Sequence, residues 1–217
     1  MFQNCKSLVS VNIPDSVTSI GRSAFAYCFA LEQINLPSGI TTIDEYAFEA
    51  CKLVTALNIP ASLTNIESNA FQRCYSLTKY TVDKDNPIYK SVDGNIYSKD
   101  GTVILHYAIG KKDKEFRTPA GVTKIGDDAF AWCENLQTVI ISDDVNVIGN
   151  NAFYKCEYLV QISLSDNVIS IENCAFAYCE RLLNVYYTGS KKDWDSISID
   201  GFNDCLINAK IRYNYVP

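Results

Sequence analysis

The strongest constraint on this chain is a repeat with a period of about 23 residues, which is typical of proteins that stack one repeat on the next. Ala-Phe pairs recur along the sequence, and a Cys stands three positions after each of these Phe residues. The Cys residues so placed are Cys28, Cys51, Cys74, Cys133, Cys156 and Cys179, and Phe2 with Cys5 has the same spacing. Successive Cys are evenly spaced, except for one much longer interval between Cys74 and Cys133.

Other apolar positions recur in phase with these Cys residues. Pairs with a spacing of two, such as Val11/Ile13 and Ile34/Leu36, predict a strand with one buried face. A second apolar pair, such as Val17/Ile20, follows in each repeat. Each repeat therefore predicts a strand, a turn, a short extended stretch and a short helical turn around Ala-Phe-x-x-Cys.

A single repeat cannot fold alone. Its apolar positions contribute roughly 1.5–3 kcal/mol each when buried, whereas ordering the backbone costs roughly 1–2 kcal/mol for each residue of the repeat. Stacking repeats at the strand spacing of about 4.8 Å buries both flanks of each coil. The sequence thus predicts a repeat solenoid in which like residues form columns, with residues 1–217 as a single solenoid domain.

Within this solenoid the regular pattern is interrupted twice. Residues 1–82 are regular and start inside a repeat, which predicts a segment truncated at its N-terminus. Residues 83–118 predict an irregular coil that carries a hairpin, because Asp93-Gly94 and Asp100-Gly101 favour tight turns; Ile88 is expected to be buried there. Residues 119–187 are regular again. Residues 188–217 predict a C-terminal cap that covers the last coil with Trp194, Ile197, Phe202, Ile207, Ile211 and Tyr213.

Composition excludes several classes of function. The chain has 19 Lys plus Arg against 25 Asp plus Glu, a net charge of -6, so no basic excess is available for nucleic acid. No run of 18 apolar residues predicts a transmembrane helix, and the first residues do not read as a signal peptide. Only one His, His106, is present, and no placed nucleophile accompanies it. We expect no enzyme activity, no metal site and no cofactor.

The cysteines admit more than one interpretation. There are nine, an odd number, and no C-x-x-C pair occurs, so the zinc-ribbon signature is absent. We predict a structural core column made of Cys5, Cys28, Cys51, Cys74, Cys133, Cys156 and Cys179, because free Cys packs as a small apolar residue. Disulfides between neighbouring coils are within reach by distance, but parallel side chains disfavour their dihedral angles. Cys174 falls at a mostly polar phase, so it is expected to be partly exposed, either as an accidental substitution or as a reactive thiol.

The repeat as a whole resembles a known family. Ile34-Asn35-Leu36-Pro37 with Ala47-Phe48-Glu49-Ala50-Cys51, and the ending Val185-Tyr186-Tyr187-Thr188-Gly189, are similar to BspA-like leucine-rich repeats. The resemblance implies a horseshoe with a parallel β-sheet on its concave face and short helical or irregular turns on its convex face. It also implies secretion or display on the surface of host-associated bacteria, adhesion or ligand binding, and no catalytic residues.

Two sets of side chains are candidates for binding. Residues between the buried strand positions should point outward from the sheet, and the polar and charged ones predict a ligand face for protein or glycan: Ser10, Asn12, Gln33, Asn35, Asn58, Lys79, Thr81, Thr138, Gln161, Ser163, Asn184 and Tyr186. The alternative is a solvated strand face. Aromatic residues beside the Cys column predict a second contact surface: Tyr27, Phe29, Tyr75, Trp132, Tyr154, Tyr158 and Tyr178. These residues could equally half-bury against the next coil.

Two functional hypotheses follow. The first is an extracellular or surface-displayed adhesion module that uses its concave face, with a host or bacterial surface protein or glycan as partner. The second is a structural spacer without a ligand of its own. In both cases we expect a monomeric segment of a longer chain, with no nucleic-acid partner and no membrane insertion.

Overall fold

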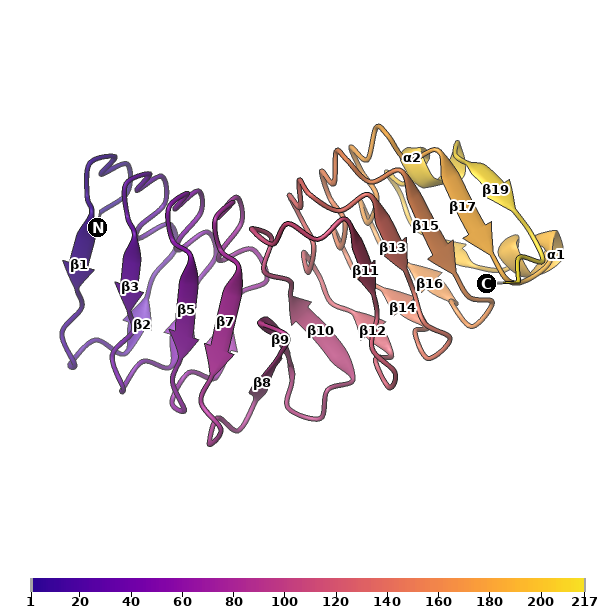
Figure 1. Ribbon diagram of the computed structural model, residues 1–217. Coiled ribbons are helices and arrows are strands. Elements are labelled where there is room, and N and C mark those ends of the chain that lie inside the picture. The colour runs from indigo at the N-terminus through magenta and orange to yellow at the C-terminus, as the bar shows by residue number, and fades with distance from the viewer. Residues whose placement is uncertain (1, 217) are drawn as a thin grey trace. The chain divides into compact units, whose positions relative to one another are not determined.

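The structure is a computed structural model that describes residues 2–216. It divides into two compact units, a first unit of residues 1–100 and 106–111 and a second unit of residues 101–105 and 112–217. Each unit is a stack of coils joined by parallel strands, and the regular coils are one sequence repeat in length (Figure 1). The predicted repeat solenoid is therefore confirmed, whereas its description as a single domain stays a prediction.

The first unit contains two series of parallel strands. One series supplies what we call the strand face, and it consists of β1 (Ser10–Asn12), β3 (Gln33–Asn35), β5 (Ala56–Ile59) and β7 (Lys79–Val82). The other, the second sheet, consists of β2 (Ser19–Ile20), β4 (Thr42–Ile43) and β6 (Asn65–Ile66). Paired residues on neighbouring strands are one sequence repeat apart, since Val11 pairs with Ile34 and Ile43 pairs with Ile66.

The second unit repeats this plan. Its strand face is a five-stranded parallel sheet of β11 (Glu115–Arg117), β13 (Thr138–Ile140), β15 (Gln161–Leu164), β17 (Asn184–Tyr187) and β19 (Lys210–Arg212). Its second sheet contains Val103–Leu105 of β10 (Val103–His106), then β12 (Lys124–Ile125), β14 (Val147–Ile148), β16 (Ser170–Ile171) and β18 (Ser198–Ile199). The same register thus aligns identical phases of successive repeats.

The core of each unit consists of the predicted columns. In the first unit the Phe25 and Phe48 rings stack with centroids 5.3 Å apart and planes 3° from parallel, and Phe71 continues the column at 5.6 Å. In the second unit Phe153 stacks on Phe130 at 5.0 Å and on Phe176 at 5.1 Å. Parallel in-register strands produce such columns because they place equal phases directly above one another.

The turns around Ala-Phe-x-x-Cys are not helical, so that prediction is wrong. Ser23 and Tyr27 have φ values of 54° and 62°, in the left-handed region, and this pattern recurs in the later coils. The N–H groups of Ser23, Phe25 and Tyr27 donate to carbonyl groups of the next coil, whereas Cys28 donates back to Phe25. The left-handed residues turn alternate N–H groups toward the neighbouring coil, which satisfies the backbone without a helix.

The predicted hairpin is present in the first unit. Strands β8 (Tyr89–Val92) and β9 (Asn95–Ser98) are antiparallel, and Asp93 and Gly94 between them have φ values of 49° and 74°. Two positive φ values are typical of the type I′ turn that Asp-Gly favours. The expected burial of Ile88 is wrong, since Ile88 is 43% exposed.

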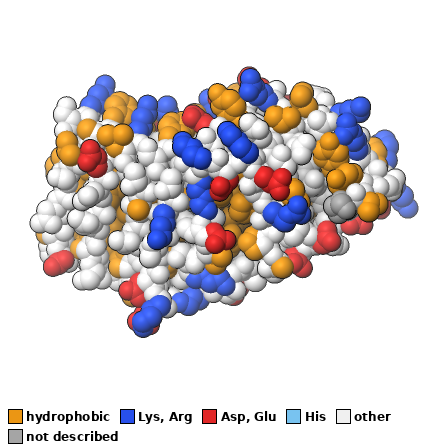
Figure 2. Space-filling view, viewed as in Figure 1, with side chains coloured by type: hydrophobic (Ala, Val, Ile, Leu, Met, Phe, Trp, Pro, Cys, Tyr) orange, Lys and Arg blue, Asp and Glu red, His pale blue; other side chains and the backbone are white. Residues whose placement is uncertain are grey.

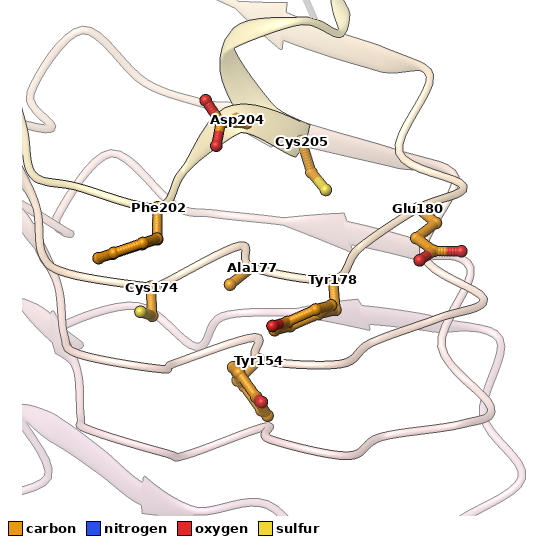
Figure 3. Close-up of a pocket in the computed structure, with 8 residues that line it drawn as sticks. All are labelled: Tyr154, Cys174, Ala177, Tyr178, Glu180, Phe202, Asp204 and Cys205. Atoms are coloured by element: carbon orange, nitrogen blue, oxygen red, sulfur yellow. The ribbon is translucent and has the colours of Figure 1, made fainter.

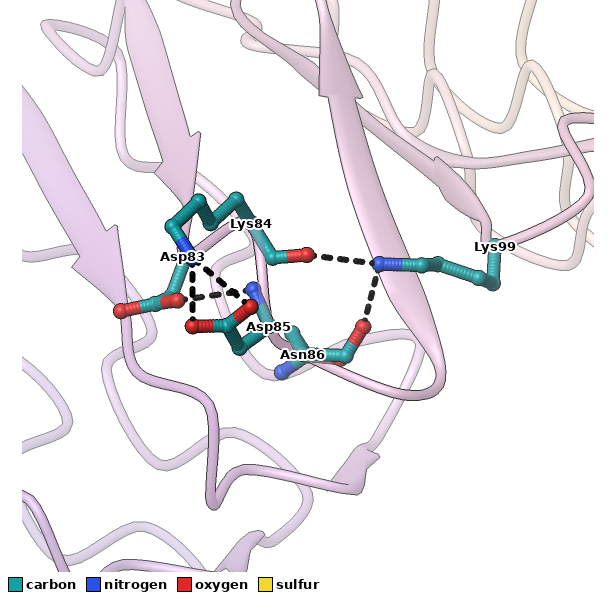
Figure 4. Close-up of polar contacts among 5 residues, drawn as sticks. All are labelled: Asp83, Lys84, Asp85, Asn86 and Lys99. Carbon is teal, nitrogen blue, oxygen red and sulfur yellow. Dashed lines mark hydrogen bonds and ion pairs between the residues drawn. The ribbon is translucent and has the colours of Figure 1, made fainter.

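A lysine closes the turn that leads into this hairpin. The Lys99 ammonium donates to the backbone carbonyl groups of Lys84 and Asn86 at 3.0 and 2.6 Å (Figure 4). Asp85 N–H donates to Asp83 Oδ1 at 2.9 Å within the same turn. The Asp-Lys-Asp sequence is therefore stabilised by hydrogen bonds from the chain's own groups.

The C-terminal residues form a further coil that also carries two short helices. Helix α1 (Lys191–Trp194) begins at a capping box between Ser190 and Asp193, and α2 (Asp204–Ile207) follows β18. Trp194 and Leu206 are buried. By contrast, Phe202 and Ile207, expected to cover the core, are 72% and 52% exposed. The cover comes instead from Leu206 and from Asn203, whose Oδ1 accepts from Phe176 N–H at 2.9 Å.

Candidate functional site

The strand face of the first unit presents polar side chains in register, all of them uncharged except Lys79. Asn12 is paired with Asn35, and Asn58 with Thr81, on neighbouring strands. The members of the predicted ligand face in this unit are all exposed: Ser10, Asn12, Gln33, Asn35, Asn58, Lys79 and Thr81. In Figure 2, viewed from the same side as Figure 1, the surface over β1 to β7 is mostly white, the colour of uncharged polar side chains and backbone.

Three of these residues share a groove. Asn35, Asn58 and Thr81 line a hollow of about 350 Å³ that is bordered by Pro60 and Asp83 at the ends of the strands. Amide and hydroxyl groups offer both donors and acceptors. The structure therefore brings together residues that lie one repeat apart in the sequence, as their common phase predicted.

The strand face of the second unit differs in burial and charge. The predicted members Thr138, Gln161, Ser163, Asn184 and Tyr186 are half-buried and lie on adjacent strands. They are flanked at both edges of the sheet by charged residues that the sequence analysis missed: Glu115, Arg117, Lys210 and Arg212. These residues occupy the same phases, with Arg117 opposite Ile140 and Arg212 opposite Tyr186, so the repeat itself carried the signal.

An aromatic pair and a guanidinium form the C-terminal part of this face. Arg212 donates to the Tyr186 hydroxyl at 2.6 Å and lies over the Tyr186 ring at 4.9 Å from its centroid. The Tyr215 ring lies 4.8 Å from the Tyr186 ring. A groove of about 540 Å³ extends past Tyr215, and Arg117, Ser163, Asp143 and Asp144 are among its lining residues.

The predicted aromatic set is half-buried in most of its members. In the first unit Tyr27 packs edge-on against Phe29 at 6.1 Å, and Lys52 lies over Phe29 at 5.0 Å. The Tyr27 hydroxyl donates to Glu49 at 2.9 Å, and this hydrogen bond together with burial raises the pKa of Tyr27. Tyr75 is also half-buried.

In the second unit the aromatic residues form a row across coils. Trp132 contacts Tyr154 at 6.0 Å, and Tyr154 contacts Tyr178 at 5.3 Å, both edge to face. The Lys155 ammonium lies between Trp132 and Tyr178, at 4.6 and 5.3 Å from their centroids. Tyr158 and Tyr178 are exposed, and Arg181 covers Tyr158 at 5.1 Å. Lysine and arginine side chains of the protein itself thus already occupy the ring faces that a cationic partner would use.

A pocket of about 490 Å³ lies at the C-terminal end of this row. Cys174 and Cys205 line it together with Tyr154, Tyr178 and Phe202, and the side chains come from successive coils (Figure 3). Both thiols are half-buried, so the prediction that Cys174 is partly exposed is confirmed. All nine cysteines of the chain are free.

The Cys column is structural. Cys51 Sγ donates to the carbonyl oxygen of Phe25 at 3.3 Å, and Cys74, Cys156 and Cys179 make the same bond to the preceding Phe of the column. Burial raises the pKa of Cys74 to about 12 and that of Cys133 to about 11. The prediction of a buried thiol is wrong for Cys5, which is exposed.

His106 is a packing residue. It is buried, and its ring lies 6.1 Å from Phe71 and 6.2 Å from Tyr80. Burial lowers the pKa of His106 to about 4, so the imidazole is neutral near pH 7. Among residues 2–216 no cluster of three or more His, Cys, Asp or Glu side chains is placed to hold a metal ion. Nor does any helix within these residues have the length and apolar character needed to cross a membrane.

The repeat geometry agrees with a comparison against protein families. Residues 1–98 and 108–214 match the family described as BspA type leucine rich repeat region, in 6 copies. The chain belongs to this family. Leucine-rich repeat proteins generally bind other proteins and are typically non-catalytic.

Several solved bacterial structures are similar to this BspA-type chain. A leucine rich cell surface protein from Faecalibacterium prausnitzii is 29% identical, with 92% of this chain and 65% of that one covered and a TM-score of 0.64. A leucine-rich repeat protein from Eubacterium ventriosum is 26% identical, with 88% and 56% covered and a TM-score of 0.76. The pneumococcal vaccine antigen PcpA, 22% identical with 94% and 56% covered and a TM-score of 0.75, shares the fold.

The chain thus spans between 56% and 65% of the length of these three structures. No protein with a curated description matches it.

Proposed function

We propose that this chain is a non-catalytic binding module of a secreted or surface-displayed bacterial protein, and that its strand faces bind a protein or glycan. The observation that carries the proposal is the exposed, in-register row Asn12, Asn35, Asn58 and Thr81, three members of which share one groove. A core-building role does not need these side chains, because the buried residues between them already form the columns. The similarity to a cell surface protein supports the location.

Polar chemistry along the row suits a ligand that is itself polar and extended. Each strand adds one amide or hydroxyl at intervals of about 4.8 Å, so a ligand lying across the strands meets a new donor or acceptor at each step. Several weak contacts then add to a useful affinity, because the parallel strands fix the spacing of the backbone positions that carry these side chains. We expect the chain to act as a monomer in this role, which light scattering on the purified chain measures.

The test compares binding of purified chain to fixed epithelial cells. The variant Asn35→Ala, Asn58→Ala, Thr81→Ala removes the row in the groove, and Ser19→Ala with Asn65→Ala, two exposed polar residues of the second sheet, is the matched control. We expect the groove variant to bind at least tenfold more weakly and the control to bind as the unchanged chain does. Treating the cells with protease or with glycosidases distinguishes a protein ligand from a glycan.

The competing role is a structural spacer without a ligand, which the half-buried polar residues of the second unit would also fit. Equal binding by the folded groove variant, or no binding by the unchanged chain, contradicts the proposal. The second of these results favours the spacer.

A further inference from the structure

From the second unit we infer that the ligand of its strand face is an acidic oligosaccharide, one that carries carboxylate or sulfate groups. This inference deepens the proposed function and rests on it. The outward residues of β11 to β19 include three cations, Arg117, Lys210 and Arg212, and one carboxylate, Glu115. The outward residues of these strands carry a net charge of +2, against -6 for the whole chain, while Asp143 and Asp144 at the strand ends line the groove beside Arg117. The cations on the outer strands of an otherwise acidic protein attract anionic groups to this face.

The cations are held at the two edges of one sheet. Arg117 lies on β11 and Arg212 on β19, in the same row of the register, with three strands between them. Four strand intervals of about 4.8 Å place these two positions about 19 Å apart. A flexible polymer with acidic groups along its length can reach both, whereas a single small anion cannot.

The guanidinium of Arg212 is oriented in advance. Its hydrogen bond to the Tyr186 hydroxyl and its position over the ring fix the side chain, although the residue is exposed. A planar guanidinium can bind carboxylate or sulfate through two parallel hydrogen bonds. Arg117 is 3.9 Å from Glu115 across an exposed pair. A pair this long and exposed holds Arg117 weakly, so an anionic ligand can compete for it.

The groups between the cations favour a sugar over an acidic peptide. Tyr186 and Tyr215 offer ring surface, and the row between them and Arg117 contains Ser163. Two carboxylates at the strand ends, Asp143 and Asp144, line the same groove. Sugar hydroxyl groups can donate to these carboxylates and so offset their repulsion of the ligand's own acidic groups, whereas the ionised side chains of an acidic peptide have no donor to offer them. Asp144 is already engaged by Gly121 N–H at 2.7 Å.

The test measures binding of the full chain to four soluble polymers of matched length. Chondroitin sulfate carries carboxylate and sulfate, unsulfated chondroitin carries carboxylate alone, dextran is neutral, and polyglutamate is an acidic peptide. We expect binding to chondroitin sulfate and, more weakly, to chondroitin, with affinity falling at least tenfold between about 50 and 300 mM NaCl because the contacts are exposed charges.

The second part of the test uses variants in which the positive charges of the strand face are removed. Arg117→Gln, Lys210→Gln, Arg212→Gln should weaken chondroitin sulfate binding by about 100-fold or more, since each charged contact is worth roughly tenfold. Arg181→Gln, Lys191→Gln, Lys192→Gln removes the same charge from exposed positions outside the strand face and should bind as the unchanged chain does. Arg212→Lys keeps the charge but not the planar fork, and should lose part of this contact, less than about tenfold.

The outcomes distinguish failure of the acidic-glycan inference from failure of the proposed function. Equal binding to dextran, tighter binding to polyglutamate, or full binding by the folded triple variant overturns the acidic-glycan inference. If none of the polymers binds while epithelial cells still do, the inference fails and the proposed function stands. If neither polymers nor cells are bound, both fail.

Discussion

The regular coils and the hairpin coil of the first unit are stabilised in different ways. In the regular coils the rings of Phe25, Phe48 and Phe71 stack within 4° of parallel. The hairpin coil is instead stabilised by buried polar residues, namely Asn86, Asn95 and His106. Where the repeat is regular, backbone N–H and carbonyl groups of adjacent coils form hydrogen bonds with one another. Where the chain departs from the repeat, these backbone groups lack such partners, and side chains must supply the hydrogen bonds.

Asn86 illustrates the replacement. Its side-chain amide donates to the carbonyl groups of Pro60 and Leu63 at 2.8 Å, and its oxygen accepts from the N–H groups of Ile88 and Tyr89. Asn95 does the same on a smaller scale, accepting from Ala108 N–H at 3.0 Å. Gly110 allows the return of the chain, because a Cβ there would lie 2.5 Å from the backbone of Leu77.

The largest expected effect comes from breaking the aromatic column. Phe48→Ala should lower the free energy of unfolding by about 4 kcal/mol, through lost burial and the cavity left between two rings. Urea denaturation measures this. Phe2→Ala is the control, since Phe2 is 45% exposed and stacks on one side only, and about 1 kcal/mol is expected for it. Equal losses at the two positions would contradict a buried column.

Removing the buried amide should cost nearly as much. Asn86→Ala leaves two N–H groups and two carbonyl groups without their partner, and we expect a loss of about 3 kcal/mol. Asn65→Ala, on an exposed strand of the same unit, should change stability by less than about 0.5 kcal/mol. If both variants unfold at the same urea concentration, the hairpin coil does not depend on its polar core.

His106 should make the hairpin coil sensitive to acid. Its pKa is about 4 in the folded chain and about 6.5 when unfolded, so the unfolded chain takes up the proton first as the pH falls. Its contribution is complete above about pH 6.5 and is lost as the pH falls from there to about 4. The difference corresponds to about 3 kcal/mol. Stability measured between pH 7 and 4 should fall more steeply for the unchanged chain than for His106→Gln, and identical slopes would refute this assignment.

The smallest effect is expected at the sulfur column. Cys51→Ala removes a buried sulfur and its hydrogen bond to Phe25 O, and about 1 kcal/mol should be lost. Cys174→Ala, at a half-buried position, should lose less than half of that. Thermal unfolding of both variants measures the difference. A larger loss at Cys174 would be inconsistent with this order.

The sequence predicted the features that repetition encodes. The strand pairs, the Phe and Cys columns and the Asp93-Gly94 turn all lie where the phases and the turn residues placed them. Repetition succeeds because each phase is sampled several times, so chance substitutions average out. The polar strand-face rows were predicted for the same reason.

Some features could not be predicted, either because they occur only once or because no residue type marks them. The bonds of Asn86 and Asn203 join side chains to backbone groups of an earlier coil, and no second copy of either residue marks its role. The left-handed residues were missed because Ser23, Tyr27 and their counterparts are not glycine, the usual signal for positive φ. Arg117, Lys210 and Arg212 were overlooked because they lie in residues 83–118 and 188–217, which the sequence indicated as an irregular coil and a cap and not as regular repeats.

The central claim is that aligned columns of buried side chains build each unit and leave the strand faces free for ligands. Thiol labelling followed by peptide mass analysis tests it most directly, since the nine cysteines are distributed over both units. In the native chain Cys5, Cys174 and Cys205 should react within minutes, while the six buried thiols, Cys28, Cys51, Cys74, Cys133, Cys156 and Cys179, should react only after unfolding in urea. Labelling of any of these six at the rate of Cys5 would contradict the account.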